Sequence, residues 1–170
     1  MAFKCYQISI ERRTSWDKRD VAKGTVLKEF NHGYSICQWS TYPEGGGLVS
    51  PREFLECRLV ERDDIKCTLF QTSPSVNDSI VKRTGIDVKP DPIAIRAETY
   101  PGNGFALEPL EAVEGDVNHP RNFKMTLISC IELGGWLSTS LINFVTSQTL
   151  LDSNRRTKMY LEQRFKISKD

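Results

Sequence analysis

The sequence has no apolar run approaching the roughly 18 residues of a membrane-spanning helix, and its amino terminus lacks an apolar signal region. It also lacks an excess of one charge. The chain has 23 Lys and Arg against 22 Asp and Glu, a formal net charge of +1, with both signs interspersed. A surface dedicated to nucleic acid is therefore not expected. We predict a cytoplasmic protein, or one that is peripheral at membranes.

Groups that carry catalysis are scarce. The only histidines, His32 and His119, lie in turn-like stretches, and no Gly-x-Ser-x-Gly sequence is present. Neither a catalytic triad nor a two-histidine metal site is suggested. The five cysteines are odd in number and lie mostly in apolar runs, which is typical of free thiols in a reducing compartment. The sequence predicts a protein that is not an enzyme and uses no metal or other cofactor.

What is present is an ordinary globular composition. The chain has 170 residues, of which 39% are hydrophobic and 26% charged, enough for one domain with a sizeable core. Runs of β-prone residues bounded by turns predict strands at 25–30, 34–41, 54–61, 65–72, 93–100, 105–109 and 122–133. Two polar turns, 31–33 and 62–64, join the first four strands into hairpins. Residues 73–92, which contain three prolines, read as a surface connection with little structure of its own.

A long helix is predicted to begin near Trp136, after a Gly134-Gly135 break. Its apolar residues, spaced by three and four, form one stripe: Leu137, Leu141, Phe144, Val145 and Leu151. The helix either closes a core or forms the lid of a cavity. Both readings give an α+β fold in which a curved antiparallel sheet of about six strands packs on the long carboxy-terminal helix.

Four pieces of the chain carry a resemblance to a known family. Trp16-Asp17 and residues 48–58, 95–98 and 134–143 occur in the order and spacing of the steroidogenic acute regulatory protein-related lipid transfer (START) domain. The similarity covers about 16–165 and resembles the sterol-carrying branch. It implies a helix-grip fold with a hydrophobic tunnel that holds one lipid, a sterol or a phospholipid. Residues 1–170 would then form a single lipid-binding domain that transfers its ligand between membranes.

The resemblance also implies a helix and three strands before Trp16, where this chain has only 15 residues. Without those strands the sheet has an unpaired edge and the tunnel an open side. The alternative function is therefore a truncated module of the same family that does not transfer lipid and acts in regulation or protein interaction.

Arg58 is the most specific candidate site residue. It lies among Leu55, Cys57, Leu59 and Val60, and a guanidinium turned into an apolar interior costs several kcal/mol unless it is paired. The position matches the cavity arginine of sterol-binding members, in which an acid on the preceding strand faces it. The equivalent position here is Trp39. From the residues alone, a surface arginine on a strand remains the alternative.

Other residues are expected to line the tunnel, to form its gates or to contact the membrane. Trp39 either lines or fills the cavity, and Arg96 forms either an outward salt bridge or a polar group in the tunnel. The glycine-rich loop 43–50 and the turn at 102–104 are candidate gates or ordinary turns. The basic end of the helix, which includes Arg155 and Arg156, either touches an anionic membrane or is solvated. The full predicted ligand-binding set is Arg58, Trp39, Val60, Phe70, Ile95, Arg96, Phe105, Leu107, Leu141, Phe144 and Val145.

Overall fold

The computed structural model describes residues 10–62, 67–73, 79–109 and 123–165. The helices are α1 (Ile10–Trp16), α2 (Ser79–Thr84) and α3 (Thr139–Phe165), with short 3₁₀ turns η2 (Asn31–Gly33) and η3 (Gly45–Gly47). The strands are β1 (Lys23–Glu29), β2 (Tyr34–Ser40), β3 (Arg52–Arg62), β4 (Cys67–Thr72), β5 (Ile95–Thr99), β6 (Asn103–Pro109), β7 (Phe123–Ile128) and β8 (Ile131–Glu132). The predicted loop 62–64 lies partly outside the described residues, as does the start of the strand predicted at 65–72.

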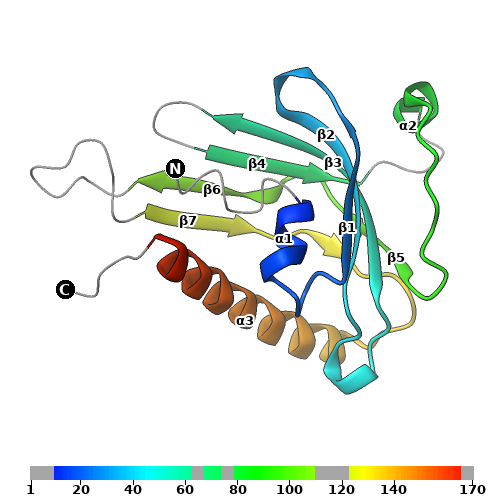
Figure 1. The fold of residues 1–170 in the computed structure, drawn as a ribbon. Coiled ribbons are helices and arrows are strands. Elements are labelled where there is room, and N and C mark those ends of the chain that lie inside the picture. The colour runs from blue at the N-terminus through cyan, green and yellow to red at the C-terminus, as the bar shows by residue number, and fades with distance from the viewer. Residues whose placement is uncertain (1–9, 63–66, 74–78, 110–122, 166–170) are drawn as a thin grey trace, which may run out of the picture.

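The strands form one curved, unclosed sheet, and α3 runs along one side of it (Figure 1). Its order is β1-β2-β3-β4-β6-β7, and β5 pairs with both β3 and β8. Every pairing is antiparallel except that of β3 with β5. The predicted α+β helix-grip architecture is confirmed. The strand predicted at 122–133 proves to be two, because the chain leaves β7 at Ile128 and pairs again as β8.

Side chains alternate between the two faces of the sheet, and each face is covered differently. On the inner face, which α1 and α3 cover, Ile10, Val21 and Cys37 form a buried cluster. On the outer face the buried cluster is Ile36, Leu55 and Val81. The prediction that 73–92 has little structure of its own is wrong, because this segment contains α2, which brings Val81 against the sheet.

The first helix falls in a stretch that the sequence presents as polar. Packing against the sheet stabilises it, because Ile10 is only 2% exposed and three further positions are half-buried, whereas Glu11, Arg12 and Ser15 are exposed. Gly24 on β1 permits this approach, since a Cβ there would lie 2.7 Å from Cγ1 of Ile10. Within the described ranges, none of the helices has the length and apolar content needed to cross a membrane.

Strands β4 and β6 approach closely at Gly104, where a Cβ would lie 1.9 Å from the carbonyl oxygen of Leu69. We predict that Gly104→Ala lowers the free energy of unfolding by about 3 kcal/mol or more, since it adds a clash to an unfavourable φ of +153°. Gly102→Ala is the matched control. Its φ is +97° and nothing lies within 4 Å of the added Cβ, so about 1 kcal/mol is expected. Equal losses in urea unfolding would show that the contact is not the cause.

Candidate functional site

A cavity of about 200 Å³, partly open to solvent, lies between the inner face of the sheet and α3. The sheet contributes Trp39, Phe54, Glu56, Gln71, Asn103 and Leu127 to its lining. The helix contributes Val145, Thr146, Thr149, Leu150 and Ser153. The residues of α3 recur at three- and four-residue spacing, so one face of the helix covers the cavity.

The floor of the cavity is polar. Glu56 is 2% exposed, and its carboxylate accepts hydrogen bonds from Nε2 of Gln71 at 2.7 Å and from the hydroxyl of Thr99 at 3.1 Å. Asn103 donates from Nδ2 to Oε1 of Gln71 at 3.2 Å, and its own Oδ1 accepts from the backbone N–H of Cys130 at 3.0 Å. We call Glu56, Gln71, Thr99 and Asn103 the polar floor. It joins β3, β4, β5 and β6 across the inner face.

Arg58 lies on the inner face and is 3% exposed, so it is not a surface arginine. Its Nε is 3.9 Å from Oε2 of Glu56, two residues earlier on the same strand. The acid that faces this arginine therefore comes from β3 itself. On the preceding strand Ser35 lies opposite Arg58, and Trp39 lies opposite Phe54. Period-two alternation along β3 could have found Glu56, because residues 54, 56 and 58 must share a face.

An aromatic wall stands beside the polar floor. Trp39 stacks on Phe54 with ring centroids 4.2 Å apart and an interplanar angle of 11°. The guanidinium of Arg13 lies 5.9 Å from the Trp39 ring centroid, a cation–π distance. Trp39 thus lines the cavity and packs against the strand next to it.

The helix turns a different face inward from the one that its apolar residues suggest. Val145 is 8% exposed and lines the cavity, but Phe144 is 65% exposed and Leu151 is 54% exposed. The prediction of one inward stripe is therefore wrong for Phe144 and Leu151, whereas Val145 is buried and Leu137 and Leu141 are half-buried. Apolar residues lie all around α3, so their spacing alone does not define one buried face. The inward face combines Val145 and Leu150 with hydroxyl-bearing side chains.

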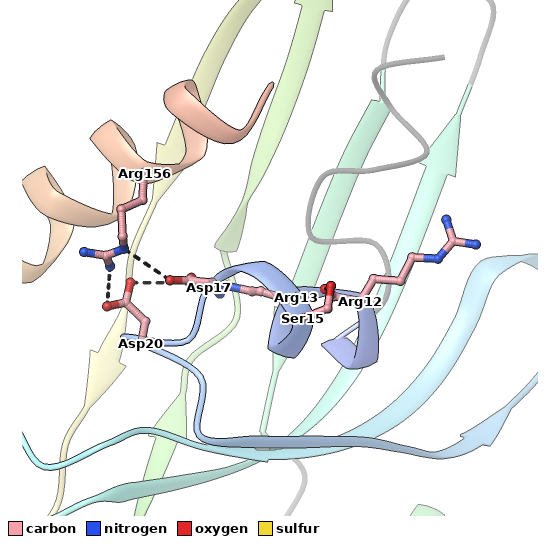
Figure 2. Close-up of polar contacts among 6 residues, drawn as sticks. All are labelled: Arg12, Arg13, Ser15, Asp17, Asp20 and Arg156. Carbon is pink, nitrogen blue, oxygen red and sulfur yellow. Dashed lines mark hydrogen bonds and ion pairs between the residues drawn. The ribbon is translucent and has the colours of Figure 1, made fainter. Parts of the chain in front are cut away.

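The carboxy-terminal half of α3 is tied to α1 by ion pairs (Figure 2). Arg156 binds Oδ1 of Asp17 at 3.3 Å and also pairs with Asp20. Arg13 binds the same two acids, Asp17 at 2.8 Å and Asp20 at 3.8 Å. We call these four residues the α1–α3 ion cluster. The cluster meets the cavity, since Arg13 and Asp20 also belong to its lining.

Aromatic stacking reinforces this attachment. The rings of Trp16 and Tyr160 stack at 4.6 Å. Breaking a buried ion pair typically costs about 3 to 5 kcal/mol, so the cluster is the stronger tie. Sequence reasoning placed Arg156 at a membrane or in solvent, and no local signal pairs it with an acid 139 residues away.

The predicted ligand-binding residues separate into four groups. Trp39 and Val145 line the cavity. Arg58, Val60, Ile95, Phe105 and Leu107 share the inner face by register with lining residues, but they lie outside the cavity as it stands. Phe70 is on the outer face and 46% exposed, and Arg96 also points outward, with Nη2 2.8 Å from Oε2 of Glu53. Leu141 is half-buried and Phe144 is exposed on α3. Contact with a ligand stays a prediction for all of them.

The glycine-rich loop lies against the helix. All three glycines of η3 have positive φ, and a Cβ on Gly45 would meet Cγ2 of Val145 at 3.7 Å. In the part of the chain that the structure describes, no group of three His, Cys, Asp or Glu side chains could hold a metal ion.

A curved sheet gripping a carboxy-terminal helix over a cavity defines a helix-grip protein with a candidate site for an apolar ligand. The family model of the START domain matches residues 3–166, and the chain belongs to this family. Family members bind and transfer lipids.

Relatives and solved structures agree with this assignment. The chain is 32% identical over 162 residues to the mitochondrial steroidogenic acute regulatory proteins of Ovis aries and Homo sapiens. Each match covers 94% of this chain and 51% of the relative, so the chain spans about half the length of these curated relatives. Human StAR-related lipid transfer protein 5 shares the fold, with a TM-score of 0.71 at 18% identity, covering 90% of this chain and 65% of that one.

Burial raises the pKa of Asp20 above its ordinary 3.8, and the neighbouring Asp17 raises it further against the opposing effect of Arg156 and Arg13. The folded state therefore disfavours the ionised form. This penalty is absent below pH 3.8 and grows as the pH rises through the folded-state pKa. We predict that the free energy of unfolding of Asp20→Asn, relative to that of the wild type, increases as the pH rises across that window.

Urea unfolding at a series of pH values measures the difference in free energy of unfolding between the variant and the wild type. Asp20→Glu, which keeps a carboxylate at the same place, is the control and should follow the wild-type pH dependence. A gap between Asp20→Asn and the wild type that does not change with pH contradicts the prediction.

Proposed function

We propose that residues 1–170 act as a single non-enzymatic domain that binds one lipid, a sterol or a phospholipid, and transfers it between membranes without a cofactor. The observation that carries the proposal is a cavity between the START sheet and α3 that has an aromatic and aliphatic wall and a buried polar floor. Such a combination suits an amphiphile, since its apolar body replaces water along the wall and its polar group meets the floor.

The polar floor offers both donors and acceptors. Gln71 and Asn103 each have a second amide hydrogen beyond the one that the floor itself uses. The carboxylate of Glu56 has lone pairs beyond those that Gln71 and Thr99 occupy. A hydroxyl or amide of the ligand would satisfy these groups, whereas a hydrocarbon there would leave them without partners at about 1 to 3 kcal/mol each.

Entry requires α3 or η3 to move, and these two elements meet at one end of the molecule (Figure 1, cyan and orange). Large apolar side chains on and beside them are exposed. Leu48 follows η3 and is 77% exposed, Phe144 is 65% exposed on α3, and Trp136, just before α3, is fully exposed. Exposed aromatic and aliphatic groups of this kind favour an interfacial location. We propose that this end contacts membranes transiently, from the cytoplasm.

A second function is favoured by the size and openness of the cavity. Its volume of about 200 Å³ is below the roughly 300 to 1,000 Å³ of typical ligand pockets. Two residues of its lining, Leu127 and Ile131, are 39% and 41% exposed. These features support a regulatory or protein-interaction module that does not shuttle lipid. Transfer of labelled lipid from donor to acceptor vesicles separates the two functions, because only the first predicts movement of lipid.

The lipid-binding proposal is tested by filling the cavity from α3. Thr149 lines it and Gln148, the preceding residue, is exposed, so Thr149→Trp and Gln148→Trp form a matched pair. We expect Thr149→Trp to weaken lipid binding at least about tenfold, equivalent to about 1.4 kcal/mol, because the indole occupies ligand space. Gln148→Trp should bind as the wild type does.

Native mass spectrometry after incubation with sterol-containing phospholipid vesicles measures this binding. Thermal unfolding of both variants controls for folding. Absence of any bound lipid on the folded wild type would contradict the proposal, as would equal lipid binding by the two variants.

A further inference from the structure

Among the described residues, Arg52 differs from other arginines of the sheet, α1 and α3 in having no carboxylate partner. Four of them have a carboxylate oxygen at 2.8 to 3.9 Å: Arg13, Arg58, Arg96 and Arg156. No ion pair joins Arg52 to a carboxylate within residues 10–62, 67–73, 79–109 and 123–165. Arg52 nevertheless lines the cavity and is only 3% exposed.

The partners that Arg52 does have are neutral. Its Nη1 donates to the carbonyl oxygen of Ser50 at 2.6 Å, and its Nη2 donates to that of Gly134 at 3.3 Å. Its Nε is buried without a hydrogen-bond partner. The guanidinium therefore spans from the chain after η3 to the turn before α3, with part of its donor set unused.

A buried charge without a counterion is unfavourable, and Arg52 shows this effect. Burial lowers the pKa of Arg52 below its ordinary value, and burial is the only cause of this shift. The guanidinium still remains protonated near neutral pH, because arginine does not deprotonate in proteins. The chain thus holds an uncompensated positive charge at the wall of the cavity.

The acids of the cavity lining do not supply the missing charge. Asp20 belongs to the α1–α3 ion cluster, and Glu56 is held within the polar floor beside Arg58. Glu44 is affected by the charges of Asp20, Arg19 and Arg156, and burial raises its pKa, which disfavours its anionic form. A counterion for Arg52 must therefore come from outside the lining.

We propose that Arg52 binds the oxyanion, phosphate or carboxylate, of an acidic lipid held in the cavity. A guanidinium presents parallel donors that match the oxygens of these groups, and such charge-assisted bonds are about twice as strong as neutral ones. The inference rests on the proposed lipid-binding function and specifies its ligand. The polar floor then holds a hydroxyl or amide of the same molecule, and Arg52 holds its acidic group.

The test uses two ligands that differ only in the anion. Phosphatidic acid and diacylglycerol with identical acyl chains are offered separately in phosphatidylcholine vesicles, and the bound lipid is quantified by native mass spectrometry. The wild type should prefer phosphatidic acid at least about tenfold. Arg52→Gln should remove that preference while still binding diacylglycerol, and Arg52→Lys should retain part of it. Arg83→Gln, which removes an exposed arginine of α2, should leave the preference unchanged.

Each other outcome overturns the inference in a recognisable way. A wild type that binds both lipids equally leaves lipid binding intact but removes the anion site. If Arg52→Gln weakens the binding of both lipids equally, the arginine has only a structural role, which is to connect Ser50 and Gly134 through hydrogen bonds. Inorganic phosphate that displaces phosphatidic acid at millimolar concentration assigns the site to free phosphate. A wild type that binds no lipid at all contradicts the proposed function itself. Because the first comparison uses the wild type alone, it holds even if a variant fails to fold.

Discussion

Strand β3 imposes the main constraint on this structure, because it carries buried charges on both faces. Glu53 points outward, and Arg52, Glu56 and Arg58 point inward, and each is no more than 3% exposed. A buried charge is tolerated only where partners surround it. Outside, Glu53 binds Arg96 of β5, Gln38 of β2 and the backbone of Asp91. The register of the strands around β3 is thus fixed by polar pairing as well as by apolar packing.

The long helix is held by a different principle. Its inner face mixes aliphatic and hydroxyl-bearing side chains over a partly open cavity, so apolar packing against the sheet is limited. Its firmest attachments lie in the second half, where Arg156 enters the α1–α3 ion cluster and Tyr160 stacks on Trp16. At the other end, the helix meets the glycine turn η3 through Val145. The attachment is therefore stronger toward the carboxy-terminal end, which is consistent with the proposed entry of lipid beside η3.

The sequence predicts the strands well because turn residues and alternation are local properties. The hairpin around 31–33 and the break at Gly134 are examples, and the family resemblance joined these pieces into one fold. Helix α2 was not predicted because its six residues lie in a stretch with three prolines. Among its described side chains the buried one is Val81, which is 4% exposed, and one buried position gives no helical pattern.

The site was harder to predict than the fold. The family resemblance implied an inward Arg58, and Arg58 is buried on the inner face, but Glu56, its acid on the same strand, was not among the predicted site residues. Phe144 was expected to face the ligand but is 65% exposed, and the contacts that attach α3 to the rest of the chain include those of Arg156 and Tyr160 in its second half. Contacts across 139 residues leave no local pattern to read. Arg52 lacked a signal for the same reason, since the absence of a counterion is visible only when every neighbour is placed.

The stack of Trp16 on Tyr160 has a spectroscopic consequence. The chain contains three tryptophans, and each occupies a different environment. Trp16 stacks on Tyr160 of α3, Trp39 lines the cavity wall, and Trp136 is fully exposed to solvent. Indole emission depends on the polarity around the ring, so variants that keep one tryptophan at a time would report separately on the α1–α3 contact, the cavity and the exposed surface before α3.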